Sequence, residues 1–331
     1  MSAELYIRRC FLCTFDPAQE FAGYNEIIPG SNDETAKYIR KLLLYNRDSM
    51  KSKPAVYDDD SPLTSILPSS EEGFEAFVNV IADEVQNLVR EYSFFEAGCG
   101  LFVWSLIDEQ NVISFFKLDY QSRLMNAVGN DGSISWKMNQ SLLPGTGQKG
   151  YEFFMINLDM QRILVSDKVH YVNHDEPVNF MAEYLLHINL NLSEKEMLDK
   201  IDDVMMDTIS EYCRDDASQK IFAYKSAMAE KVAQDGRIHM AEVTDEIFGD
   251  NVEAADLCRE RLAQNHIPGS PVMVGNKSER SLQKKHKIVT ASGIEILVPP
   301  ELLDNDNFFK YSIDENGAAV ILIRENAGME E

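Results

Sequence analysis

The most regular hydrophobic pattern in the chain lies between Phe74 and Tyr92, where apolar residues recur at steps of three and four. This spacing follows the 3.6-residue period of an α-helix with one buried face. Ser69 and Glu72, three residues apart just before the pattern, predict a capping box at its start. We therefore expect a long amphipathic helix whose buried face is formed by Phe74, Phe77, Val78, Ile81, Val85, Leu88, Val89 and Tyr92.

Two further capping boxes mark the starts of other helices. Ser31 with Glu34 predicts a helix that reaches about Met50. Ser193 with Glu196 predicts another, because apolar residues follow it at helical spacing. Beyond this point the pattern stays helical, and we expect helices at residues 217–234, 240–248 and 251–264.

Apolar runs of strand length form the second kind of pattern. Residues 101–107 and 112–118 are separated by four polar residues, which predicts an antiparallel hairpin. Both runs are almost continuously apolar, which indicates a central strand pair buried on both faces. The polar, proline-containing stretch 51–70 predicts a long loop. Additional strands are expected at residues 3–15, 20–28 and 152–166.

The C-terminal end of the chain returns to strand patterns. Two hairpins are expected there, from runs 287–290 and 294–298 and from runs 308–313 and 318–323; Asn316-Gly317 lies in the second turn and is a strong hairpin signal. The sequence thus predicts an α+β fold. An N-terminal mixed α/β domain with a central antiparallel strand pair would cover residues 1–190, and a helical middle with a small β-rich C-terminal unit would cover residues 191–331.

Charge changes the functional picture. The chain of 331 residues carries 31 basic and 55 acidic residues, a net charge of −24, which repels nucleic acid in general. Contact with DNA therefore requires a local basic patch or a partner protein. The five scattered cysteines predict reduced, mostly buried thiols. Because no long apolar segment and no signal-peptide pattern are found, we expect a cytoplasmic protein that does not interact with membranes.

Two local runs of basic residues stand out against this acidic background. One, a candidate site for phosphate contacts, lies near the C-terminus, and a hydroxyl could help to fix its register on DNA. The second lies on the first expected helix and the loop after it. Either run could instead be a solvated surface. The candidate DNA-binding residues are Lys277, Ser278, Arg280, Lys284, Lys285 and Lys287 in the first run, and Arg40, Arg47 and Lys51 in the second.

The C-terminal third resembles the 37-kDa nucleoid-associated protein family of bacteria. The resemblance is carried by the stretch Gly275–Leu282, by Lys287-Ile288, by Ser292–Ile296 and by the hairpin that ends in Ile321-Leu322-Ile323. It extends from Phe222 onward. The order of expected elements before residue 190 also fits the family, whereas residues 120–215 match it poorly. The resemblance implies association with the nucleoid, DNA binding and no established catalysis.

Other motifs are weaker candidates for chemistry. Cys10 and Cys13 have a metal half-site spacing but no second pair, and strand alternation points them to opposite faces. His170 with His174 lies in a strand or loop pattern, where two surface histidines are expected. The run 58–60 is a solvated acidic loop, and the glycine-rich loop 145–150 precedes a strand and lacks the P-loop order. We therefore expect no catalytic residues, no metal and no cofactor.

These observations favour a nucleoid-associated, non-catalytic protein that binds double-stranded DNA through its phosphate backbone without reading sequence. The alternative is an acidic adaptor recruited to DNA by partner proteins, such as topoisomerases, which the net charge favours. A third class, a metal-dependent nuclease or hydrolase, would depend on residues 58–60 or on His170 and His174. A homo-oligomer is compatible with each of these hypotheses.

Overall fold

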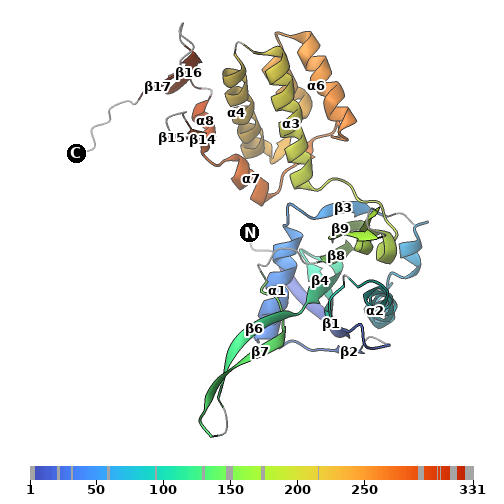
Figure 1. Cartoon of the computed structure of the whole chain (residues 1–331). Coiled ribbons are helices and arrows are strands. Elements are labelled where there is room, and N and C mark those ends of the chain that lie inside the picture. The colour runs from blue at the N-terminus through green and yellow to red at the C-terminus, as the bar shows by residue number, and fades with distance from the viewer. Residues whose placement is uncertain are drawn as a thin grey trace. The chain divides into compact units, whose positions relative to one another are not determined.

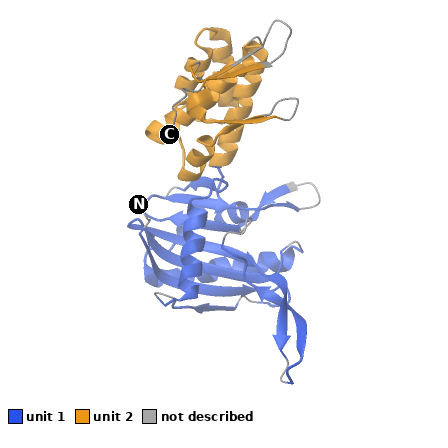
Figure 2. Ribbon diagram, turned by 90° about the vertical axis from the view of Figure 1, so that its left-hand side faces the viewer, with its two compact units in different colours: residues 1–193 blue, residues 194–331 orange. Residues whose placement is uncertain are grey.

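The computed structural model divides the chain into two compact units, residues 1–193 (unit 1) and 194–331 (unit 2), shown in Figure 2. The boundary expected from the sequence was after residue 190. Each unit is described by itself. The structure describes residues 4–20, 23–30, 33–57, 60–93, 95–128, 131–146, 152–172, 176–214, 216–289, 294–303, 305, 307–313 and 319–324.

Unit 1 is built on a seven-stranded, fully antiparallel sheet with the strand order β2-β1-β4-β5-β8-β9-β3. The expected central hairpin is confirmed, and its two strands are buried on both faces. Asp108 and Glu109 form its turn with φ of 49° and 66°, the left-handed geometry that suits a two-residue hairpin turn. The strands are β1 (Leu5–Phe15), β2 (Gly23–Glu26), β3 (Lys53–Val56), β4 (Gly98–Ile107), β5 (Gln110–Asp119), β8 (Glu152–Asn157) and β9 (Arg162–Ser166).

A helix packs on each face of this sheet (Figure 1). The helix α2 (Phe74–Glu91) buries its predicted apolar stripe in a core that also contains Phe102 and Phe154. The helix α1 (Glu34–Arg47) packs on the opposite face, where Leu101 lies. Because successive residues of a strand point to opposite faces, Leu101 and Phe102 enter different cores. This two-sided burial explains why the sequences of β4 and β5 are almost continuously apolar.

Two of the predicted helix caps are wrong. The helix α1 is capped by Asp33, whose carboxylate accepts a hydrogen bond from the Ala36 amide at 2.5 Å, and Ser31 lies outside the described residues. A short 3-10 turn, η2 (Glu71–Gly73), precedes α2 and makes Gly73 its cap residue. Glu72 lies inside that turn, so it cannot form a capping box with Ser69. The side chain of Asp33 therefore caps α1, and α2 continues from the 3-10 turn η2 without a side-chain cap.

Several elements of unit 1 were not predicted. The expected loop 51–70 contains β3, an edge strand that tolerates Pro54 because one side of an edge needs no amide donor, and the 3-10 turn η1 (Pro62–Ser65). The stretch 152–166, expected as one strand, is the pair β8 and β9. Beyond it lie the hairpin β10 (Val169–Val172) with β11 (Glu176–Asn179) and the π-helix η3 (Met181–Leu186).

A further element that was not predicted is a separate two-stranded hairpin, β6 (Gln121–Val128) with β7 (Ile134–Leu142). Figures 1 and 2 show it extending away from the main sheet. Residues 134–139 of β7 alternate between apolar and polar side chains, a strand signal that the sequence analysis did not use.

Unit 2 is mainly helical, and its four predicted helices are confirmed as α3 (Glu194–Tyr212), α4 (Ala217–Asp235), α5 (Met240–Phe248) and α6 (Val252–Gln264). Gly236 ends α4 with a φ of 63°, a left-handed conformation that favours glycine. The short strands β12 (Arg237–Ile238) and β13 (Val272–Met273) pair with each other, on either side of α5 and α6 in the sequence.

The two C-terminal hairpins are confirmed as β14 (His286–Val289) with β15 (Glu295–Val298) and β16 (Phe309–Ile313) with β17 (Ala319–Ile323). The turn residues 314–318 lie outside the described part of the chain. Two short helices, α7 (Asn276–Leu282) and α8 (Pro300–Leu303), were not predicted. Phe222 of α4, Val298, Leu303 and Phe309 share a small core. The whole chain is an α+β protein.

Candidate functional site

The C-terminal basic run is placed by α7 and the turn that follows it. The helix α7 begins after Gly275, whose amide donates a hydrogen bond to the Glu194 carboxylate at 2.9 Å. Lys277 and Arg280 lie on α7, and Lys284 and Lys285 lie in the segment between α7 and β14. The short helix therefore gathers basic side chains that the sequence only showed to be close along the chain.

Four cations of this run are exposed, and three of them, Arg280, Lys284 and Lys285, form no ion pair with an acidic side chain within the described residues. We call these three residues the basic patch. The neighbouring Glu279 accepts a hydrogen bond from Gln283 at 3.1 Å. Lys287 is already paired, with its Nζ 2.6 Å from the Glu295 carboxylate. The basic patch thus provides the cations of this run that are most accessible to a phosphate.

Ser278 does not lie where a DNA contact would need it. The residue is fully buried, and its hydroxyl is not presented to solvent. Asn276 and Arg280, two residues before and two after Ser278 on α7, lie on the other side of the helix and are exposed. Lys277 is half-buried. The expected role of Ser278 in fixing the register on DNA is therefore not supported by its position.

The N-terminal basic run is mostly engaged inside unit 1. Arg40 donates a hydrogen bond to the carbonyl oxygen of Leu5 at 2.6 Å. Arg47 contacts Asp48 at 2.8 Å and Asp108 at 3.0 Å, so its guanidinium ties α1 to the central hairpin. Lys51, after the helix, is exposed. The two arginines thus have a structural role, and they belong to a different unit from the basic patch.

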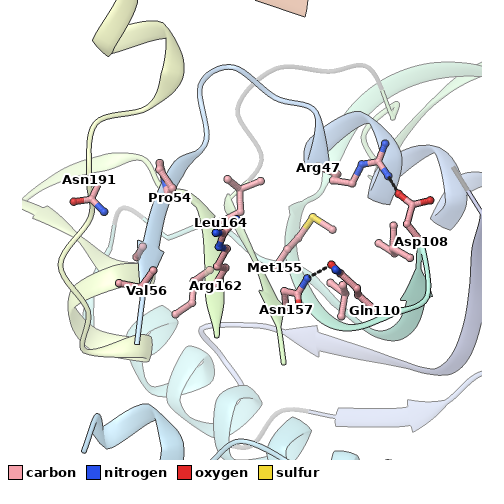
Figure 3. Close-up of a pocket in the computed structure, with 14 residues that line it drawn as sticks. Arg47, Pro54, Val56, Asp108, Gln110, Met155, Asn157, Arg162, Leu164 and Asn191 are labelled. Carbon is pink, nitrogen blue, oxygen red and sulfur yellow. Dashed lines mark hydrogen bonds and ion pairs between the residues drawn. The ribbon is translucent and has the colours of Figure 1, made fainter. Parts of the chain in front are cut away.

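A cavity of about 500 Å³ opens in unit 1 and is shown in Figure 3. Arg47 and Asp108 lie at one side of it, and Pro54 and Val56 of β3 lie at the other. Met155 forms part of an apolar floor. Among the described residues that line it there is no histidine, cysteine, serine or lysine, and its one carboxylate is paired with Arg47. The cavity can hold an apolar group, but its lining offers no nucleophile.

A buried group of charged side chains lies where β5, β8 and β10 meet. Lys117 and Glu152 occupy paired positions of β5 and β8, and the side chain of each is only 2% exposed. Lys117 forms an ion pair with Asp119, which also contacts Lys168 at 3.0 Å. His170 lies 2.9 Å from Glu152. Opposite charges compensate one another here, which is how charges persist in a core.

The carboxyl group of Asp167 lies next to this group. Its burial raises the pKa of Asp167 to about 7, although the Ala182 amide donates a hydrogen bond to it at 3.1 Å. Sequence reasoning missed these residues. A lysine inside the apolar run 112–118 was the available signal, because an unpaired lysine would not be tolerated there.

The weaker motifs do not assemble into a site in the described residues. Cys10 and Cys13 point to opposite faces of the sheet, as predicted, and burial raises the pKa of each thiol to about 12. His170 contacts Glu152, while His174 lies outside the described residues, as do residues 58–59 and 147–150. No group of three histidine, cysteine or acidic residues that could hold a metal is found in the described parts of the chain.

Comparison with known proteins adds no assignment. No protein-family model matches the chain, and no curated protein sequence matches it. None of the helices in the described residues is long and apolar enough to cross a membrane.

Proposed function

We propose that the chain is a non-catalytic, nucleoid-associated protein that binds double-stranded DNA through the phosphate backbone, with the basic patch as its contact site. One observation carries this proposal: Arg280, Lys284 and Lys285 are exposed and form no ion pair with an acid among the described residues, in a chain of net charge −24. The resemblance of the segment from Phe222 onward to the 37-kDa nucleoid-associated family supports it.

The chemistry of the patch suits phosphate better than bases. Lysine and arginine neutralise phosphate charge and release condensed counterions, which makes binding depend on salt and not on sequence. The acidic surface elsewhere repels the duplex, so it would restrict contact to the patch. Binding is therefore expected to be weak, local and sequence-independent.

A matched pair of charge reversals tests the assignment. Lys284→Glu with Lys285→Glu changes the patch, and Lys41→Glu with Lys51→Glu changes two exposed lysines of unit 1 by the same amount. The first pair should weaken binding to a short duplex and reduce its log–log salt slope by nearly two units, since each phosphate contact contributes about 0.9. Fluorescence anisotropy measures both quantities.

The control pair discriminates between site and net charge. Equal weakening by the two double variants would mean that total charge governs binding, and the patch would lose its special role. A larger loss from Lys41→Glu with Lys51→Glu would move the site to the N-terminal run.

A second function, an acidic adaptor that reaches DNA only through a partner, is favoured by the net charge of −24. A DNA-organising protein such as a topoisomerase would be a suitable partner class. This alternative predicts that the pure protein retains no duplex even at low salt, and that DNA is recovered only when a partner is added.

A further inference from the structure

The hairpin of β6 and β7, here called the arm, leaves the body of unit 1 and pairs with no other strand of the described residues (Figure 1). A free two-stranded hairpin is only marginally stable in water, because neither face is covered. Its large apolar side chains are unusually open to solvent: Trp136 is 75% exposed and Ile134 is 76% exposed. The arm therefore has the properties of a structure that is completed by a partner.

The strand register separates the arm into two faces. Residues that pair directly across an antiparallel ladder lie on the same face, and the next pair lies on the other. The pair Asn126↔Trp136 therefore shares a face with the pairs on either side of it at steps of two. The first face holds Leu124, Met138, Asn126, Trp136, Val128 and Ile134, and the second holds Arg123, Asn139, Met125, Lys137, Ala127 and Ser135.

The first face is mainly apolar, with Asn126 as its single polar residue, and carries no charge. Five of its six side chains are large and apolar, and each of these is at least 53% exposed. The two cations of the arm, Arg123 and Lys137, both lie on the second face. A tryptophan side chain alone offers on the order of 150–250 Å² for burial, so the stripe approaches the size of exposed patch that marks an interface.

We propose that the uncharged face of the arm packs against the same face of a second copy of this chain, and that the arm is a dimerisation element. Two copies with a net charge of −24 each repel one another over most of their surface, so they can approach only where charge is absent. A two-fold axis requires a self-complementary patch, and an apolar stripe without charge meets that requirement. Two such ribbons can stack face to face, as sheets do in a sandwich.

The other occupant to consider is DNA. Arms that enter the minor groove insert single apolar wedges between base steps. The minor groove is polar, so it offers no apolar surface to cover a stripe of five apolar side chains. The identical stripe of a second copy can cover all five. The geometry therefore favours a second chain.

A charge placed on each face in turn tests the proposal on the full chain. Ile134→Glu and Trp136→Glu put carboxylates on the apolar face, where two copies would face each other across the two-fold axis. Ser135→Glu puts the same charge on the opposite face of the same strand. Sedimentation equilibrium should give the wild type and Ser135→Glu twice the chain mass of 37.6 kDa, while the other two dissociate at least tenfold more readily. Thermal melting checks that each variant stays folded.

Thiol cross-linking provides an independent readout. All five native cysteines are buried, so an engineered thiol on the arm is the accessible one. Stacked sheets lie about 10 Å apart, too far for a disulfide but within reach of a short bis-maleimide cross-linker. With that reagent Asn126→Cys, on the apolar face, should give a covalent dimer, and Ser135→Cys should remain a monomer on a denaturing gel. A monomeric wild type at micromolar concentration, or equal effects from both faces, overturns the proposal. The proposal is also overturned if the Ile134→Glu variant remains a stable dimer but has lost DNA binding.

Discussion

At the scale of single residues, the buried charged group of unit 1 is the least expected feature. Lys117 and Glu152 are nearly inaccessible, and each has a partner of opposite charge or a histidine within contact distance. Their cost in desolvation is offset by these contacts. Sequence reasoning treated residues 112–118 as an almost continuously apolar run, and it could not place Lys117 beside Glu152, because the pairing of β5 with β8 is a tertiary contact.

Removing Lys117 from its ion pair with Asp119 should destabilise unit 1. Lys117→Met leaves Asp119 without its buried partner, and the expected loss in the free energy of unfolding is about 3 kcal/mol. Lys168→Met removes a half-exposed partner of the same carboxylate and should cost less. Both tryptophans of the chain lie in unit 1, so fluorescence during urea unfolding reports on that unit. Equal losses from both variants would contradict the burial argument.

Asp167 gives a pH-dependent prediction. Its pKa in the folded state is about 7, above the ordinary 3.8, so the folded state favours the protonated carboxyl. The stabilisation is complete below pH 3.8 and is lost as the pH rises through 7, at no more than about 1.4 kcal/mol per pH unit.

Asp167→Asn should therefore be as stable as the wild type at low pH and more stable at pH 8. Its amide oxygen can still accept the hydrogen bond from Ala182. Urea unfolding at several pH values measures the difference, and a difference that does not change with pH would rule out Asp167 as its source.

At the scale of elements, the sequence predicted those helices and strands whose apolar residues recur with a clear period. The stripe of α2, the central hairpin and the helices α3 to α6 of unit 2 were predicted correctly, because each buries an apolar face with a clear spacing. The strand β3, the arm and α7 were missed. The strand β3 and the helix α7 are too short for apolar periodicity to distinguish them from loops, whereas residues 134–139 of the arm alternate between apolar and polar side chains and could have been recognised as a strand.

The candidate site, like the fold, could be predicted from the sequence only in part. The cluster of cations was visible in the sequence, but the sequence could not tell which of them were already engaged. Arg47 is paired with Asp108, which is distant in the sequence, and Lys287 is paired with Glu295 across the hairpin of β14 and β15. Ser278 is buried in a helix that was not expected. Only tertiary structure separates these residues from Arg280, Lys284 and Lys285.

The central strand β4 makes a further prediction at this scale. A Cβ atom added at Gly100 would lie 2.6 Å from the ring of Phe15 and 2.9 Å from that of Phe115. Gly100→Ala should therefore strain the α2-side core, with a cost of about 1–3 kcal/mol. Gly145→Ala, where nothing lies within 4 Å of the added atom, is the matched control. Tryptophan fluorescence during urea unfolding should show a loss only for the first variant.

At the scale of the whole molecule, the two units contribute different features. Unit 1 supplies a two-sided sheet core and the arm, and unit 2 supplies the basic patch. An acidic chain with one exposed basic patch should bind a duplex locally and weakly, and a dimer would gain affinity by presenting two patches. The DNA-binding proposal and the arm proposal are separate, since a monomer could still bind DNA.

The most direct test of the DNA-binding proposal is the salt dependence of binding to a short duplex by the full chain. Anisotropy titrations at several salt concentrations should give a straight log–log plot with a slope of about −3, the value for three phosphate contacts per patch at about 0.9 each. A slope near that value supports direct backbone contact by Arg280, Lys284 and Lys285. No binding at the lowest salt concentration, or binding that does not change with salt, would contradict it.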